Sequence, residues 1–488
     1  MMKRVLFCML TLTLLLGTVG CAMPWNAQNA MQAATPDYKG GSNGDGSPST
    51  VGVVDDANCD AVEILVNGAA LPGFSSGRVQ YWVSVTNLTE APTVTATAAS
   101  TQAIVDVVST VEKAVITVTS ADQTNEKVYT VTFVDTATYD KYDLDLYTLP
   151  YWDGNIVYNE TIMFVIDNEA PLLYTPDTVL SVRSSDLKTE YVLGQDYEVR
   201  DGKIVRLEGS RMPYFTEEQF YPTSNETSPS GQTQQCNVPG HPLILFSEGH
   251  YFYEHQVVVT YTHTDEWEGF VPQKSTKLHK FVERAEAGEE LNIVFYGDSI
   301  TAGGNPSGQG ENPVDPGTPR WSTIVTNALQ ARFPNATINE INTAQGGKNS
   351  QWGLENIQGR VVDKDPDLLV LAWGMNDTGR MPTDYAELNE KMIKAVLKRH
   401  PDCEILLVST MLPHDKLSRF YGNQRLFEGK LYVNAAKYDN IDVAPVTSAH
   451  TSILEHKRYF DMTGNNVNHP TDYLTRIYAQ TVLRVLLG

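Results

Sequence analysis

Two apolar runs, LNIVFY (291–296) and LLVLAWG (368–374), constrain the fold of this chain more than any other feature. Neither run alternates polar with apolar residues, so each predicts a strand that is covered on both faces. Between them, apolar side chains recur at helical spacing at Trp321, Ile324, Val325, Ala328, Leu329 and Phe333. Strands that alternate with helices predict a parallel sheet with helices on both sides, which is a three-layer α/β domain.

Further elements continue this alternation to the end of the chain. We expect strands at 336–342, 404–410 and 441–446, and helices at 385–398 and 471–487. In parallel sheets of this kind, functional groups gather beyond the carboxyl ends of the strands. The segments that follow the strands are therefore the place to look for a site.

Four polar or glycine-rich stretches lie where such a domain would place a site. Three follow predicted strands and the last precedes the C-terminal helix: GDSITAGG (297–304), NTAQGGKNS (342–350), GMNDTG (374–379) and NNVNHPTD (465–472). Each alone is common turn chemistry, but four in this order are far more specific. In these stretches the sequence resembles the SGNH hydrolase (GDSL esterase) family, from residue 290 to the C-terminus. The resemblance implies a catalytic domain at 286–488 with four signature residues, Ser299, Gly347, Asn376 and His469.

The chemistry of these residues agrees with the resemblance. A serine hydroxyl is a poor nucleophile unless a base takes its proton, and His469 would be the base for Ser299. The carbonyl oxygen of the substrate becomes an anion during the attack and needs hydrogen-bond donors aimed at the developing charge. We expect the backbone N–H groups of Ser299 and Gly347 and the side-chain amide of Asn376 to be those donors. Gly346 is the alternative to Gly347, whose spacing along the chain fits better.

One position departs from the family pattern. The family usually has an aspartate three residues before the histidine that orients it, and here that possible orienting position holds Asn466. In another triad enzyme, the change from aspartate to asparagine lowered turnover by about 10,000-fold because it selected the wrong tautomer. Three possibilities follow for His469. In the first, the Asp461 side chain reaches His469. In the second, a backbone carbonyl accepts the imidazole N–H, which gives a dyad like that of some carbohydrate esterases of the family. In the third, the enzyme is inactive. We favour the dyad.

The N-terminus has the pattern of an export signal. Two basic residues precede an apolar stretch from Val5 to Val19 that is too short to span a bilayer comfortably, and Cys21 follows it. The arrangement resembles the lipobox of bacterial lipoproteins and predicts a signal peptide at 1–21. It also predicts an exported, lipid-anchored chain, attached through Cys21 at the cell surface or in the periplasm. An ordinary signal peptide cut nearby is the alternative. Residues 22–54, with the run KGGSNGDGSPST, predict a flexible tether.

Two β-rich domains are predicted between the tether and the α/β domain. Residues 55–135 contain alternating runs such as AVITVTS (114–120), and their layout resembles immunoglobulin-like or cadherin-like sandwiches of bacterial surface proteins. Residues 136–285 predict a β-rich accessory domain with a hairpin that turns at Asp201-Gly202 and a long loop at 222–242. Aromatic residues cluster in this domain, which favours a packed core over a sugar-stacking face.

Charge and cysteine content narrow the possible partners. The formal net charge is −23, from 59 acidic against 36 basic residues, which argues against nucleic acid or an anionic membrane surface as the main partner. Any membrane contact would come through the lipid anchor. Cys59, Cys236 and Cys403 have no metal-site spacing and allow at most one disulfide, and the sequence implies no metal or cofactor.

The C-terminal stretch NVNHPTDYLTRIYAQ resembles the Asn-His-Pro variant of carbohydrate-active SGNH proteins. With export and upstream β-rich domains, it predicts a serine esterase that removes O-acetyl groups from plant or microbial polysaccharides or oligosaccharides through an acyl-enzyme. One alternative is a hydrolase of lipids or other small esters, because an acyl chain longer than about four carbons would need an apolar channel that acetyl does not. The other alternative is an inactive surface lipoprotein that binds glycans.

Overall fold

The computed structural model describes residues 57–86, 88–136 and 142–488. The predicted signal peptide, the lipidation site Cys21 and the tether lie outside the described residues. Within the described residues, no helix has the length and apolar character needed to cross a membrane. Cys59, Cys236 and Cys403 are free thiols, so the described part of the chain contains no disulfide between them.

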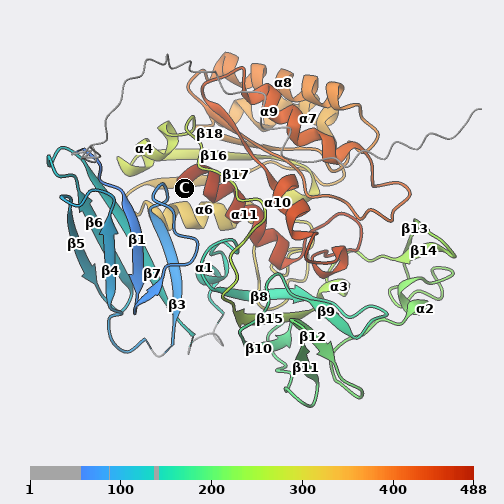
Figure 1. The fold of residues 1–488 in the computed structure, drawn as a ribbon. Coiled ribbons are helices and arrows are strands. Elements are labelled where there is room, and N and C mark those ends of the chain that lie inside the picture. The colour runs from blue at the N-terminus through green and yellow to red at the C-terminus, as the bar shows by residue number, and fades with distance from the viewer. Residues whose placement is uncertain (1–56, 87, 137–141) are drawn as a thin grey trace, which may run out of the picture. The chain divides into compact units, whose positions relative to one another are not determined.

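The C-terminal part of the chain is an α/β domain with a five-stranded parallel sheet, as predicted (Figure 1). The strand order is β17-β16-β18-β19-β20. The strands are β16 (Glu290–Gly297), β17 (Thr337–Asn342), β18 (Leu368–Ala372), β19 (Glu404–Val408) and β20 (Ile441–Ala444). Each neighbouring pair is parallel, so the carboxyl ends of all five strands meet at one edge.

Helices cover both faces of this sheet, which explains why its strands are apolar throughout (Figure 1). One face carries α6 (Trp321–Arg332) and α11 (Asp472–Leu487), and the other α7 (Ser350–Arg360), α8 (Pro382–Arg399) and α9 (Phe427–Ala435). In β16, Phe295 packs in the core under the first pair, whereas Tyr296 packs in the core under the other three. Further helices are α4 (Lys280–Glu286), α5 (Ser299–Ala302), α10 (Val446–Ile453) and short 3-10 turns at Val362–Lys364, Asn423–Leu426 and Tyr459–Asp461.

The N-terminal described region consists of two sheets around one core, of orders β2-β1-β4 and β3-β7-β6-β5. Its strands are β1 (Ala61–Val66), β2 (Ala69–Ala70), β3 (Gln80–Val85), β4 (Val94–Ala98), β5 (Ile104–Ser109), β6 (Lys113–Thr119) and β7 (Glu126–Asp135). The predicted alternation is confirmed in β6, where Ala114, Ile116 and Val118 are fully buried. The strand-rich character predicted for this part of the chain is therefore correct.

The middle region, residues 142–285, is built from several small sheets, of orders β10-β15-β8, β11-β12-β9 and β13-β14. Its strands are β8 (Ile156–Ile162), β9 (Glu169–Pro171), β10 (Thr178–Ser184), β11 (Tyr197–Arg200), β12 (Lys203–Arg206), β13 (Thr233–Val238), β14 (His241–Leu245) and β15 (Val257–Thr262). One-turn helices are α1 (Leu144–Tyr147), α2 (Glu217–Phe220) and α3 (Tyr251–Glu254).

Two local predictions for the middle region have different outcomes. The hairpin at Asp201-Gly202 is confirmed, and both residues have positive φ, 50° and 73°, as a tight two-residue turn requires. The long loop predicted at 222–242 is wrong in its second half, because β13 and the start of β14 form a hairpin there. Strand β13 (TQQCNV) is polar and buries only Cys236, so it lacks the apolar signature of a core strand. Its partner β14 (HPLIL) ends in two buried apolar residues, Ile244 and Leu245, and this apolar run is too short to stand out in the sequence.

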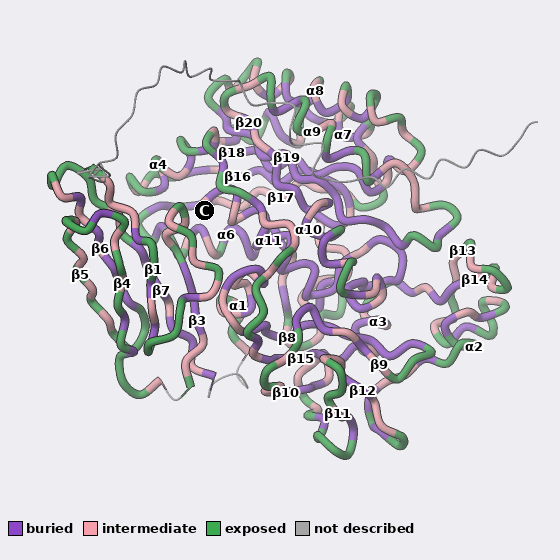
Figure 2. Tube along the Cα trace, in the orientation of Figure 1, coloured by how far each residue is buried: buried purple, intermediate pink, exposed green. Residues whose placement is uncertain are grey.

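The middle region shares a core with the α/β domain. One continuous set of buried side chains includes Ile162 of β8, Tyr261 of β15 and Leu474 of α11. Figure 2 shows buried chain running from the parallel sheet into β8 and β15. A fully buried ion pair between Lys457 and Glu160 also joins the two regions. Because a buried charge without its partner is costly, this pair ties the two regions together.

Candidate active site

Ser299 is the first residue of α5, and only Asp298 separates it from the end of β16. Asp298 caps this short helix by accepting a hydrogen bond from the Ile300 N–H at 3.1 Å, and it accepts a second from the Met375 N–H at 3.2 Å. Burial raises the pKa of Asp298 to about 7, and the two N–H donors oppose that rise. Through Asp298 the first and third polar stretches are joined beneath the serine.

Gly297 explains how β16 can place the serine so close to β18. A Cβ added at this glycine would lie 2.2 Å from the Ala372 carbonyl oxygen, which is far inside van der Waals contact. Only glycine allows the ends of these two strands to approach in this way. The glycine of the Gly-Asp-Ser motif therefore has a packing role, and the next two residues form the site.

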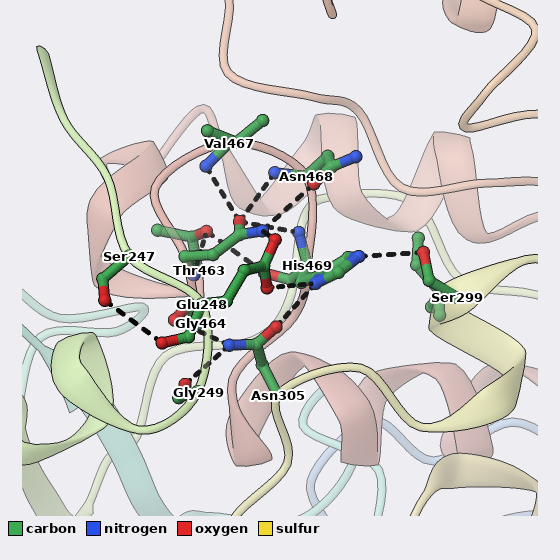
Figure 3. Close-up of polar contacts among 12 residues, drawn as sticks. Ser247, Glu248, Gly249, Ser299, Asn305, Thr463, Gly464, Val467, Asn468 and His469 are labelled. Atoms are coloured by element: carbon green, nitrogen blue, oxygen red, sulfur yellow. Dashed lines mark hydrogen bonds and ion pairs between the residues drawn. The ribbon is translucent and has the colours of Figure 1, made fainter. Parts of the chain in front are cut away.

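His469 lies beside Ser299, as predicted. Its Nε2 atom is 2.8 Å from the Ser299 hydroxyl oxygen, and the imidazole side chain is 12% exposed (Figure 3). When the hydroxyl donates to Nε2, the neutral imidazole carries its proton on Nδ1. This is the arrangement that a general base for a serine nucleophile needs.

The Nδ1 side of His469 contacts two side chains that the sequence analysis did not identify (Figure 3). The side-chain oxygen of Asn305 lies 2.6 Å from Nδ1, and the Glu248 carboxylate lies 3.3 Å from it. The amide nitrogen of Asn305 donates to the carbonyl oxygens of Gly249 at 2.6 Å and Gly464 at 3.2 Å. Both amide hydrogens are thereby used, so the network requires the Asn305 oxygen to face the imidazole.

The residues predicted to orient His469 are directed elsewhere, so the prediction of Asp461 or Asn466 as the orienting group is corrected here. Asn466 is buried, with φ 63°, and its side-chain N–H donates to the Leu245 carbonyl oxygen at 2.8 Å. The Asp461 carboxylate accepts hydrogen bonds from the Arg458 guanidinium and from the Met163 N–H. The predicted dyad is also corrected, because the group at Nδ1 is a side-chain amide and not a backbone carbonyl.

Asn465 sets the shape of the loop that holds the histidine. Its side-chain oxygen accepts from the backbone N–H groups of Val467, Asn468 and His469 at 3.0, 2.9 and 3.1 Å. One asparagine thus fixes the backbone of three successive residues in the loop before α11. Its nitrogen donates to Asn468 and to the Glu248 carboxylate, at 3.1 and 3.3 Å. The loop and the acidic side chain at Nδ1 are therefore held by the same residue.

The oxyanion role of the Ser299, Gly347 and Asn376 donors stays a prediction. The side-chain nitrogen of Asn376 donates to the Lys348 carbonyl oxygen at 2.9 Å, which leaves its second N–H for a ligand. Gly347 has φ 70°, a conformation that favours glycine. A Cβ added at Gly346 would lie 3.8 Å from the Ser299 Cβ, so Gly346 lies against the serine and remains the alternative donor.

Part of this site could not be found from motifs. Asn305 follows directly after GDSITAGG, so its position next to the first stretch was the one available signal. Glu248 belongs to the middle region, in a segment without a recognisable motif, and only the fold brings it to His469. The described residues contain no cluster of three or more His, Cys, Asp or Glu side chains arranged to hold a metal ion.

Residues 295–475 match the model of the GDSL-like Lipase/Acylhydrolase family, in agreement with the resemblance predicted from the four stretches. Similar solved structures include a two-domain esterase active on acetylated mannans, with 23% identity, 44% of this chain covered and a TM-score of 0.36. The match spans 54% of that esterase's own chain. An acetylxylan esterase from Geobacillus stearothermophilus has 19% identity over 40% of this chain and 93% of its own, at a TM-score of 0.32. No curated protein sequence matches significantly.

Proposed function

We propose that this protein is a serine esterase that removes O-acetyl groups from polysaccharides or oligosaccharides. The observation that carries the proposal is the 2.8 Å contact between the Ser299 hydroxyl and His469 Nε2 in a GDSL-like domain. The asparagine-rich C-terminal stretch and the predicted export of the chain favour a glycan ester as substrate. Two neighbours of the Ser299–His469 pair are small or polar, since Gly346 lies against Ser299 and Asn305 contacts His469, which suits a short acyl group on a polar alcohol.

In the first half of the reaction, Ser299 Oγ bonds to the ester carbonyl carbon while Nε2 of His469 takes its proton. The carbonyl oxygen becomes an anion, and we expect the N–H of Ser299, a glycine N–H of the 346–347 pair and the Asn376 amide to donate hydrogen bonds to it. The C–O bond to the sugar then breaks, and Nε2 gives its proton to the departing sugar oxygen. The product is an acetyl ester on Ser299.

In the second half, a water molecule gives a proton to Nε2 and bonds to the acetyl carbon. The bond to Ser299 Oγ breaks, the proton returns to Oγ, and acetate leaves. The whole cycle uses one ester and one water and yields one alcohol and one acid, so the residues at the site suffice without an oxidant or reductant. Export and the lipid anchor at Cys21 belong to this proposal as predictions from the sequence.

The test is acetate release from a panel of native acetylated xylans, mannans and pectins. We expect release by the wild-type protein and a loss of at least about 1,000-fold in Ser299→Ala. Ser75→Ala, a change at an exposed serine of the N-terminal region, is the matched control and should release acetate like the wild type. A fluorophosphonate probe should label the wild type and Ser75→Ala, but not Ser299→Ala.

Other outcomes of the same assay separate the alternatives. Turnover that rises from acetyl to octanoyl esters, without acetate release from any glycan, would identify a lipid or small-ester hydrolase and refute the glycan assignment. Acetate release that survives in Ser299→Ala would show that the reaction occurs elsewhere. Neither turnover nor probe labelling in the folded wild-type protein would favour the inactive glycan-binding lipoprotein.

A further inference from the structure

The imidazole of His469 becomes positively charged when it takes the proton of Ser299. In triad enzymes a single aspartate at Nδ1 does two things, because it holds the tautomer and it stabilises the imidazolium. Here the side chain closest to Nδ1 is the amide of Asn305, at 2.6 Å. A neutral amide oxygen can accept the Nδ1 hydrogen, but it carries no charge to balance the imidazolium.

Asn305 is well suited to hold the tautomer. Its two amide hydrogens are donated to the carbonyl oxygens of Gly249 and Gly464, so the side chain cannot flip without losing both hydrogen bonds. Its backbone has φ 73°, a conformation that asparagine tolerates better than most residues. The Asn305 oxygen is therefore a fixed acceptor that keeps the proton on Nδ1 and leaves Nε2 free to accept from Ser299.

Glu248 has the charge that Asn305 lacks. Its carboxylate lies 3.3 Å from Nδ1, and Asn465 donates to it at 3.3 Å. Burial by itself raises the pKa of Glu248. The hydrogen bond with His469, the charge attraction of His469 and the hydrogen bond from Asn465 lower it by more than burial raises it, so the pKa of Glu248 is lowered overall. The Glu248 side chain is 54% exposed, so water screens part of its attraction.

We propose that Glu248 of the middle region and Asn305 of the α/β domain share the work of the missing aspartate. Asn305 holds the tautomer of His469, and Glu248 stabilises the imidazolium. Both are positioning residues, since they act on the reaction through His469. The inference rests on the proposed esterase function, because it concerns the base of that reaction.

The remaining acidic group near the imidazole does not replace Glu248. Asp298 is buried beneath Ser299, and its carboxylate accepts from the N–H groups of Ile300 and Met375. It is not among the hydrogen-bond or ion-pair partners of Nδ1, which are Asn305 and Glu248. A change at Glu248 therefore removes the one carboxylate among the described residues that contacts Nδ1.

The proposal gives the middle region a part in catalysis. Glu248 lies between β14 and α3, outside the predicted catalytic domain at 286–488. Gly249, whose carbonyl oxygen fixes the Asn305 amide, comes from the same segment. The region predicted as an accessory domain thus completes the site instead of only presenting substrate to it.

The experiment compares wild type, Glu248→Gln, Glu248→Asp and Glu254→Gln in steady-state hydrolysis of an acetyl ester over a range of pH. Glutamine keeps the shape and removes the charge, so we expect kcat of Glu248→Gln to fall by about 10- to 100-fold with KM nearly unchanged. The acidic limb of its kcat/KM profile should move to lower pH by about one unit, because the imidazolium has lost a stabilising charge. Glu248→Asp keeps the charge and should recover part of kcat and the wild-type limb. Glu254→Gln is the matched control, an exposed glutamate of α3 with the same change in net charge, and should behave like the wild type.

The outcomes distinguish this inference from the function on which it rests. If the wild type is active and Glu248→Gln has the same kcat and the same acidic limb, the role of Glu248 is overturned. The esterase function then still stands. If Glu248→Gln lowers the melting temperature but leaves the acidic limb of the kcat/KM profile at the wild-type pH, Glu248 only supports the loop. That result would also overturn the proposal. A wild type without turnover or fluorophosphonate labelling would overturn the function, and the inference with it.

Discussion

Gly304 offers a direct test of whether the observed position of His469 is the working one. A Cβ added at Gly304 would lie 3.0 Å from His469 Nδ1, 3.1 Å from its Cε1 and 3.2 Å from the Ser299 carbonyl oxygen. Comfortable contacts between such atoms begin near 3.5 Å, so the imidazole would have to move by roughly 0.5 Å. Gly304 is not among the glycines with positive φ, so alanine can adopt its backbone conformation. The change in Gly304→Ala is therefore steric and falls on the histidine.

A shift of that size is enough to weaken the 2.8 Å contact between Nε2 and Ser299 or the 2.6 Å contact between Nδ1 and Asn305. Since misplacement by 1 Å costs about 100-fold in rate, we expect kcat of Gly304→Ala to fall by about 10-fold or more. Overpacking should lower the free energy of unfolding by about 1 to 2 kcal/mol, so the protein stays folded. Steady-state kinetics on an acetyl ester and urea unfolding measure the two effects.

Gly429→Ala is the matched control, because it adds the same methyl group in the first turn of α9, where no atom outside the local helix backbone lies within 4 Å. It should leave kcat unchanged and stabilise the helix by up to about 1 kcal/mol. If folded Gly304→Ala has the kcat of the wild type, the imidazole does not work from the position described, and the assignments of Asn305 and Glu248 at Nδ1 fail with it.

Two further predictions concern the oxyanion site and the pH dependence of stability. Asn376→Ala removes one predicted donor and should lower kcat by about 100- to 1,000-fold, with the melting temperature reporting any loss of fold from the lost Lys348 contact. His414 is buried and stacks on Tyr459, and burial lowers its pKa from the ordinary value of 6.5 to about 4. Between pH 6.5 and pH 4, this histidine therefore binds a proton in the unfolded chain but not in the folded chain. Stability should therefore fall as the pH decreases, by about 2 kcal/mol from this group between pH 7 and pH 5 in urea unfolding, and His414→Gln should reduce that fall.

The parallel sheet could be predicted because its strands are buried on both faces. Phe295 and Tyr296 of β16 pack in two different cores, so the whole run is apolar and stands out in the sequence. Strand β13 has no such pattern, since its sequence TQQCNV is polar and only Cys236 is buried, while its backbone pairs with β14. The sequence analysis does not predict helix α7. This helix begins at the polar cap Asn349, which lies inside the stretch NTAQGGKNS that is assigned to the site.

The residues of the candidate site also fall into two groups, those that a local sequence pattern marks and those that only tertiary contacts bring to the site. Ser299 and His469 lie in stretches with a recognisable pattern, and the fold brings them within hydrogen-bond distance. The groups at Nδ1 depend on tertiary contacts between segments far apart in the chain. No local pattern marks Glu248, and a single exposed glutamate carries no signal of its own.

The position of Asn466 also follows from how the middle region packs. This residue occupies the place of the usual aspartate, but it is fully buried with its N–H on the Leu245 carbonyl oxygen of β14. A carboxylate there would face that carbonyl oxygen without a donor, which is costly in a buried setting. Asparagine is thus the residue that allows β14 to lie against the histidine loop. The same contact brings the segment that follows β14, with Glu248, to Nδ1. The departure from the family pattern and the unexpected acidic partner therefore have one structural cause, and Asn466 is no argument for an inactive enzyme.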